Sequence, residues 1–265
     1  ALILAFLIGI GIVYTNASGL KKACSEFGNI INLAIRRSVV PLLPLYIFGI
    51  FMQMSFTGDV GRILSAFLVV ILIIFALHIF ILLYEFVVAG SFVGRNPLRL
   101  LWKMLPAYLT ALGTASSVAT IPVTTKQTQQ NGVSADITNF TIPLCATTHM
   151  SGSMMKITCC ALTICLLQNI PYSFSLFAEF IFMLSLVMVA APGVPGGAIM
   201  AALGPLGTVL GFQSDEQALI IALYIAMDSF GTACNVTGDG AIALIVDKIA
   251  HKWDGKRPQA ENNAL

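Results

Sequence analysis

The sequence predicts an all-α membrane protein, a polytopic helical bundle with two re-entrant helical hairpins and inverted repeats. The first observation is composition: 57% of the 265 residues are hydrophobic and 10% are charged, and the mean hydropathy is +0.90. Soluble domains carry about 25% charged residues. The second is that apolar runs cover nearly all of the chain, and the third is that the later runs are broken by Pro, Gly, Ser and Thr. No separate soluble domain is therefore expected.

The first half of the chain contains the clearest candidate for a membrane span. A span needs about 20 apolar residues, and residues 63–90 meet this length with only His78 and Glu85 as interruptions. These two side chains lie seven residues apart on one helix face, which favours a structural pair. Residues 1–13 are apolar from the first position, with no Met and no charged start. We therefore expect upstream membrane helices to be missing from this chain.

The second half consists of apolar segments that are short and end in small polar residues. The breaks fall at residues 113–122, 147–153, 192–197 and 231–239. Lipid offers no partner to a free backbone group, so broken segments must lie inside protein or line a cavity. Each half pairs a hairpin-like segment with a broken helix, which is typical of the binding site of a secondary transporter.

Two carboxylates lie in the last broken segment. An ionised carboxylate in the middle of a membrane costs about 3 kcal/mol or more unless it meets a partner. We interpret Asp228 and Asp239 as functional, with a capping role at the membrane surface as the alternative. Asn235 lies between them, and unwinding at Gly231 and Gly238 would free carbonyl oxygens that suit Na⁺.

Two tips rich in small residues are candidates for ligand contact and gating. Thr114, Ser116, Ser117 and Thr120 form a hydroxyl-rich tip, where helix N–H groups can bind a carboxylate. A solvent loop is the alternative. The glycines of residues 192–197 could absorb the backbone changes of a gate, although a plain turn remains open.

Two further ionisable residues carry open interpretations. His149 could be a proton site, a ligand or a buried hydrogen-bonded histidine. Lys156 lies in an apolar stretch, where it could extend to the membrane surface or pair with a carboxylate.

Other classes of protein fit the sequence poorly. The net charge of +2 and the lack of a basic stripe exclude nucleic-acid binding. The six cysteines have no metal-like spacing. His149 with Ser151 or Ser153 makes no catalytic constellation, so we expect neither an enzyme nor a cofactor. A channel would need a continuous polar pore, against which the paired hairpins argue.

Residues 113–124 resemble the first re-entrant hairpin of the dicarboxylate/amino acid:cation symporters, the family of glutamate transporters. Residues 147–153, 192–197 and 228–239 resemble, in order, its broken penultimate helix, second hairpin tip and last helix. The resemblance implies a homotrimer with an elevator fold in the bilayer. Its parts would be a partial scaffold (1–56), a transport domain (57–250) with hairpins near 98–131 and 183–211, and a polar tail (251–265). The basic tail fits a cytoplasmic C-terminus in a bacterial inner membrane.

The resemblance also implies roles for single residues. Ser117 and Asn235 would hold the substrate carboxylate, Asp228 the α-amine and Thr232 the side-chain end. The full substrate set is Ser116, Ser117, Val194, Asp228, Gly231, Thr232 and Asn235. Asp239 would bind Na⁺ with carbonyls of Cys145, His149 and Asn235, and Thr147 and Met150 would form a second cation site. The gate would be Pro192, Gly193, Pro195, Gly196 and Gly197.

Three departures from the family pattern bear on the predicted substrate and cation. Gly231 stands where members with acidic substrates carry an Arg, and Ala115 stands where some members carry a second basic residue in the first hairpin. Ser151 replaces a carboxylate that ligates a cation. We therefore predict a symporter that couples Na⁺ or H⁺ to uptake of a small amino acid, neutral rather than acidic. A C4-dicarboxylate or acidic amino acid carrier, with Lys156 as its base, is one alternative. A non-transporting or channel-like membrane protein is another.

Overall fold

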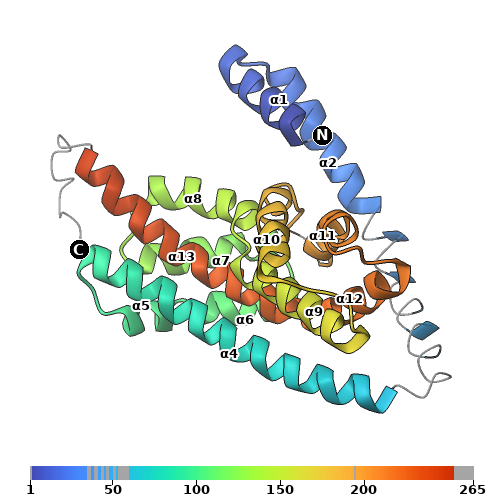
Figure 1. Ribbon diagram of the computed structural model, residues 1–265. Helices are drawn as coiled ribbons and strands as arrows, with labels where there is room; N and C mark the ends of the chain where they lie inside the picture. The colour runs from blue at the N-terminus through green and yellow to red at the C-terminus, as the bar shows by residue number, and fades with distance from the viewer. Residues whose placement is uncertain are drawn as a thin grey trace.

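The computed structural model describes residues 2–34, 60–193 and 195–253, with isolated positions between 37 and 52. Within these ranges the regular elements are all helices (Figure 1). Val194, which was predicted to contact the substrate, lies outside the described residues, as do most of residues 35–59 and the tail after Trp253.

The first two helices form a pair of their own. Helix α1 (Leu2–Thr15) is apolar throughout, and α2 (Ser18–Ala34) is amphipathic. The chain turns between them at Asn16, whose φ of 51° lies in the left-handed region that Asn tolerates better than most residues. The pair lies at the edge of the helical assembly in Figure 1.

Among the described residues, two stretches are long and apolar enough to cross a membrane. In α4 (Val60–Val93) this stretch is Phe67–Val93, whose 27 residues extend about 40 Å as a helix. The other joins α8 (Ala135–Thr148) to α9 (Ser151–Gln168), and it is interrupted at residues 149–150. Both exceed the roughly 30 Å of a bilayer's hydrocarbon core.

Helices α6 (Leu105–Thr114) and α7 (Ser117–Gln130) form the first hairpin, which follows the short helix α5 (Pro97–Lys103). The chain reverses at Ala115, which has a positive φ of 47°. Ser116 caps α7, because its Oγ accepts a hydrogen bond of 3.3 Å from the Ala119 N–H. A tight tip of this kind leaves the N-terminal N–H groups of α7 directed away from the hairpin.

Helices α10 (Phe174–Met188) and α11 (Gly197–Thr208) form the second hairpin. Residues 189–196 connect them, and Gly196 has a φ of 73°, which favours glycine. Helix α12 (Ser214–Ala226) follows and packs on α9 and α11.

The last two helices meet at a sharp bend. Helix α13 (Asp228–Trp253) begins directly after Met227, and it is bent by 63° from α12. It is one continuous helix, so the predicted break at residues 231–239 is wrong. Gly231 and Gly238 do not unwind the chain; each lacks a side chain where another residue's side chain approaches closely.

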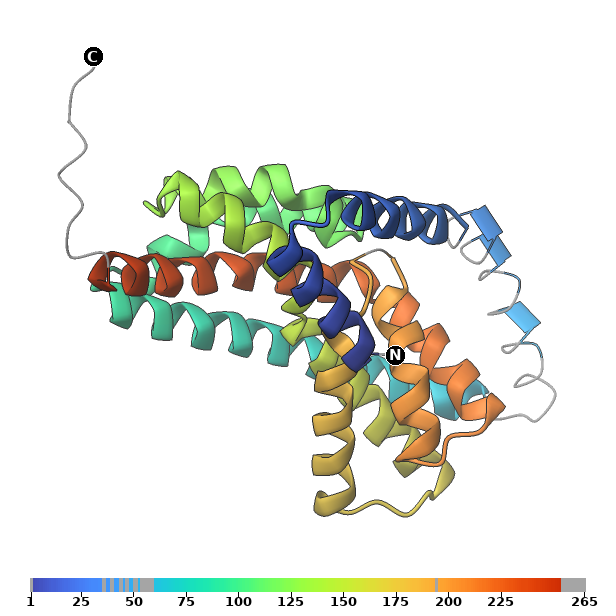
Figure 2. The same ribbon diagram turned by 90° about the horizontal axis from the view of Figure 1, so that it is seen from above.

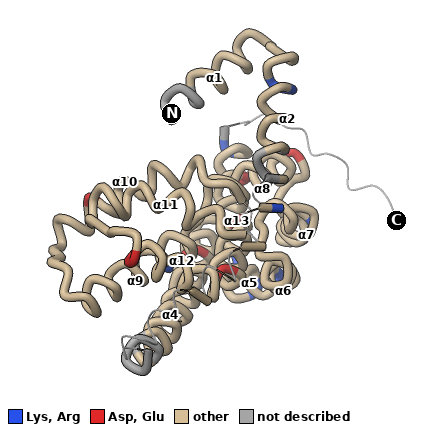
Figure 3. Tube along the Cα trace, turned by 90° about the vertical axis from the view of Figure 1, so that its right-hand side faces the viewer, with Lys and Arg blue, Asp and Glu red and all other residues tan. Residues whose placement is uncertain are grey.

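Helix α13 runs through the assembly beside α4, with α5–α8 on one part of it and α9–α12 toward its start (Figure 2). Apolar residues form two cores, one among α9–α12 and the first half of α4, the other around α13, α5–α8 and the second half of α4. Charged residues are sparse along the helices (Figure 3). The polar residues of α13 therefore lie between two apolar cores.

Candidate functional site

A small pocket lies where the two hairpin tips approach the starts of α9 and α13. Its lining brings together four separate segments of sequence, and the residues are Ala115, Ser117, Met150, Ser153, Pro192, Gly193, Ala198, Tyr224, Asp228, Thr232 and Asn235. Six of these were predicted from the sequence for substrate contact or gating: Ser117, Pro192, Gly193, Asp228, Thr232 and Asn235.

The second hairpin tip covers the pocket through two hydrogen bonds. Ser116 Oγ donates to Gly193 O at 2.9 Å, which joins the two hairpin tips. Gly196 N–H donates to Asp228 Oδ2 at 2.7 Å, which joins the second tip to the start of α13. Both bonds would have to break for the tip to move away.

Asp228 is buried and pairs with a lysine from α9. Its Oδ1 lies 3.5 Å from Lys156 Nζ, and the lysine side chain is fully buried. Lys156 Nζ also donates to Met227 O at 3.2 Å and Tyr224 O at 3.4 Å, and it lies 3.4 Å from the centre of the Tyr224 ring. The open question about Lys156 is thereby answered: it pairs with a carboxylate.

The Asn235 side chain organises the start of α9. Its Oδ1 accepts hydrogen bonds from the N–H groups of Gly152, at 2.8 Å, and Ser153, at 3.2 Å. Its Nδ2 donates to Ser153 Oγ at 2.9 Å. Because Met150 provides no side-chain cap, Asn235 supplies from α13 the acceptor that this helix start needs.

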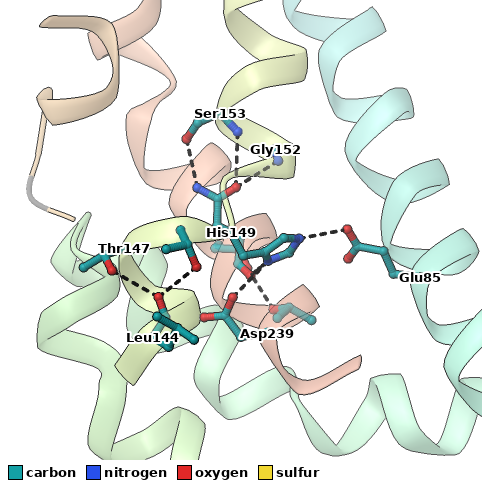
Figure 4. A network of polar contacts seen from close by, with 11 residues as sticks. Glu85, Leu144, Thr147, His149, Gly152, Ser153 and Asp239 are labelled. Atoms are coloured by element: carbon teal, nitrogen blue, oxygen red, sulfur yellow. Dashed lines mark hydrogen bonds and ion pairs between the residues drawn. The ribbon is translucent and has the colours of Figure 1, made fainter. Parts of the chain in front are cut away.

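His149 lies between two carboxylates in the break between α8 and α9 (Figure 4). Its Nδ1 is 2.9 Å from Asp239 Oδ1 and 3.2 Å from Asn235 O, and its Nε2 is 3.3 Å from Glu85 Oε1. Gly238 makes this possible, because a Cβ there would lie 2.6 Å from His149 Cε1 and would also collide with Glu85.

Glu85 was missed as a site residue, and its predicted pairing with His78 is wrong. His78 Nε2 instead lies 3.1 Å from Gly152 O. Seven residues along a helix span about 10 Å, so two side chains on one face can meet different partners. An ionisable residue inside an apolar run was itself the signal that could have identified Glu85.

Two other residues predicted to bind a cation form hydrogen bonds within their own segment of the chain. Thr147 Oγ1 donates to Leu144 O at 3.0 Å, and Cys145 O accepts the His149 N–H at 2.8 Å. Met150 is buried at the pocket. Over the described ranges, no three His, Cys, Asp or Glu side chains form a group suited to a metal ion. A cation here would depend on backbone carbonyls in addition to Asp239.

Comparison with known proteins places the chain in a family. The sequence model of the sodium:dicarboxylate symporter family matches residues 1–249. The chain belongs to this family. The resemblance drawn from the motifs and the predicted all-α membrane fold are both confirmed by this match and by the helices described above.

Relatives in the sodium:dicarboxylate symporter family include animal transporters. Excitatory amino acid transporter 1 of Rattus norvegicus is 30% identical over 275 residues, which cover 99% of this chain and 50% of the relative. An excitatory amino acid transporter of Caenorhabditis elegans is 29% identical over 253 residues, 92% of this chain and 50% of the relative. The chain spans about half the length of these relatives, and both are named as transporters rather than enzymes.

Proposed function

We propose that the protein is a symporter that couples inward movement of a cation to uptake of a small acidic amino acid or a dicarboxylate. The observation that carries this proposal is the pocket in which Asp228, Thr232 and Asn235 of α13 face two hairpin tips, in a chain of the sodium:dicarboxylate symporter family. The substrate would displace the contacts that now close this pocket.

The chemistry of the pocket suits an amino acid. The start of α7 offers the Ser117 hydroxyl and the positive end of the helix dipole to a carboxylate. Asn235 would contribute its amide, and the Asp228 carboxylate would pair with the substrate ammonium. The Ser116 side chain would hold the closed tip in place.

The proposed substrate class, acidic, differs from the neutral one that Gly231 led us to predict from the sequence. A neutral amino acid finds no support among the relatives, which are named for excitatory amino acids. A basic group also lies close to Gly231, since a Cβ at that position would be 3.0 Å from Lys156 Nζ. The acidic alternative, with Lys156 as its base, therefore becomes the proposal.

The cation would bind at Asp239. Its carboxylate is buried close to His149, whose ring contacts the Asn235 carbonyl. Carboxylate and carbonyl oxygens are the ligands that hard cations prefer. We propose Na⁺ as the coupling ion at Asp239 and the carbonyls of Cys145, His149 and Asn235, with Thr147 and Met150 in a second cation site.

The larger organisation is also a proposal. Residues 1–56 would belong to the scaffold and residues 57–250 to a transport domain of a homotrimer. The last turn of α13 contains His251 and Lys252, which supports a cytoplasmic C-terminus under the positive-inside rule.

The second hairpin tip would be the gate, and Gly193 provides a test of it. Gly193→Ala should weaken substrate binding about tenfold, because the added Cβ would lie 2.7 Å from Ala146 O and 2.9 Å from Val118 Cγ2 in the closed tip. Titration calorimetry on the purified protein measures this. Gly204→Ala on α11 is the matched control, because a Cβ there meets nothing within 4 Å. Equal affinity in both variants would contradict a closed tip at Gly193.

Ligand-induced stabilisation tests the function without transport. L-Aspartate at about 100 times its dissociation constant should stabilise the purified protein by about 2.7 kcal/mol. Its melting temperature should rise more with Na⁺ present than with choline. No shift with aspartate or succinate, in either salt, would contradict the proposed function.

A further inference from the structure

Lys156 is a fully buried cation whose partners are shared with the pocket. Two residues that its ammonium contacts, Tyr224 and Asp228, line the pocket, and so does Ser153, which lies three residues earlier on the same face of α9. Lys156 itself does not line the pocket. Its ammonium therefore lies one layer of side chains behind the pocket wall.

The lysine occupies the space beside Gly231. A Cβ at Gly231 would lie 3.0 Å from Lys156 Nζ, 3.3 Å from its Cε and 3.5 Å from Ser153 Oγ. The next residue, Thr232, lines the pocket. A long basic side chain at position 231 would thus occupy the same space as the Lys156 side chain. In this chain the positive charge in that space comes from α9.

In this structure the charges of Lys156 and Asp228 compensate each other. Among the described residues, the carboxylate that pairs with the buried Lys156 ammonium is Asp228, at 3.5 Å. Removing one member of a buried ion pair leaves the other charge uncompensated and is strongly unfavourable. A ligand whose ammonium takes Asp228 must therefore bring a negative charge for Lys156.

We propose that Lys156 is the residue that selects an acidic amino acid, by exchanging Asp228 for the side-chain carboxylate of the substrate. The substrate ammonium then pairs with Asp228, and both buried charges keep a partner before and after binding. This inference rests on the proposed function and narrows it to one substrate class. Lys156 then determines substrate specificity, because position 231 on α13 is a glycine and carries no basic group.

The proposal predicts that three substrates bind with different affinities. Aspartate satisfies both Asp228 and Lys156. Serine supplies an ammonium for Asp228 but no second carboxylate, so Lys156 is left without an ionic partner. Succinate has no ammonium, so Lys156 stays with Asp228 and the second carboxylate has no cation. Aspartate should therefore be preferred over both.

The test measures uptake of labelled aspartate, serine and succinate by the protein expressed from its complete gene. Lys156→Gln keeps amide donors for the Tyr224 and Met227 carbonyls but removes the charge. The aspartate-to-serine uptake ratio should fall on the order of 10- to 100-fold. Lys103→Gln, at a lysine on α5 that binds Gln130 O, is the control and should keep the ratio of the parent protein.

A paired variant distinguishes specificity from a purely structural role. Lys156→Ala with Gly231→Arg returns a cation to the same place from α13, and it should restore a preference for aspartate that Lys156→Ala alone lacks. A ratio that stays unchanged in Lys156→Gln, or no recovery in the paired variant, would overturn the inference. Uptake by the parent protein that favours serine or succinate would overturn it while leaving symport intact. Uptake of none of the three would overturn the proposed function together with it.

Discussion

Asp228→Asn should abolish uptake of amine-bearing substrates while the protein still reaches the membrane. The asparagine keeps the shape of the side chain and an oxygen for the Gly196 N–H, which now donates to Oδ2 at 2.7 Å. It removes the charge that pairs with Lys156 and, in the proposed function, with the substrate ammonium. The loss of a buried ionic partner should lower aspartate uptake at least about 100-fold.

The measurement for Asp228 is initial-rate uptake of labelled aspartate, corrected for the amount of protein in the membrane. Asp215→Asn is the matched control, because Asp215 lies exposed in the first turn of α12. Uptake by Asp228→Asn at the rate of this control would remove Asp228 from the substrate site.

Asp239→Asn should sharply raise the Na⁺ concentration that uptake requires. Asp239 is 1% exposed and its Oδ1 lies 2.9 Å from His149 Nδ1, so bulk solvent cannot replace a lost ligand there. An amide of the same shape provides one neutral oxygen where a hard cation prefers a carboxylate. The Na⁺ concentration for half-maximal uptake should rise on the order of 100-fold.

A sodium titration of uptake measures this effect. Asp247→Asn serves as the control on the same helix, since Asp247 Oδ1 accepts hydrogen bonds from the N–H and hydroxyl of Ser134 at the start of α8. This control should change stability without changing the sodium dependence. A sodium titration of Asp239→Asn that matches the parent protein would exclude Asp239 as a cation ligand.

Much of the site could be predicted from sequence because buried charge is costly in a membrane. Asp228 and Asp239 stood out for that reason, and both lie within the polar networks described above. The small-residue tips also marked the ends of real helices at Ala115 and Gly196. Composition sufficed for the fold class, since a chain this apolar has few other ways to satisfy its backbone.

Other features could not be predicted, for physical reasons. A glycine in a helix can mean either that the helix unwinds or that another group packs closely against it. The close approach of Lys156 to Gly231 and of His149 to Gly238 shows that packing is the reason here. The partner of Glu85 lies 64 residues away along the chain. The partner of Lys156 lies 72 residues away, on another helix. Pairings at such separations depend on tertiary structure, which local sequence patterns do not predict.

Uptake into proteoliposomes is the measurement that tests cation-coupled transport most directly. The protein expressed from its complete gene would be reconstituted with choline inside, and labelled aspartate would be supplied under an inward Na⁺ gradient, an inward H⁺ gradient or neither. We expect aspartate to accumulate above its external concentration under the Na⁺ gradient alone. Equal, non-accumulating uptake under all three conditions would show that no cation gradient drives the protein, and it would contradict the proposed symport.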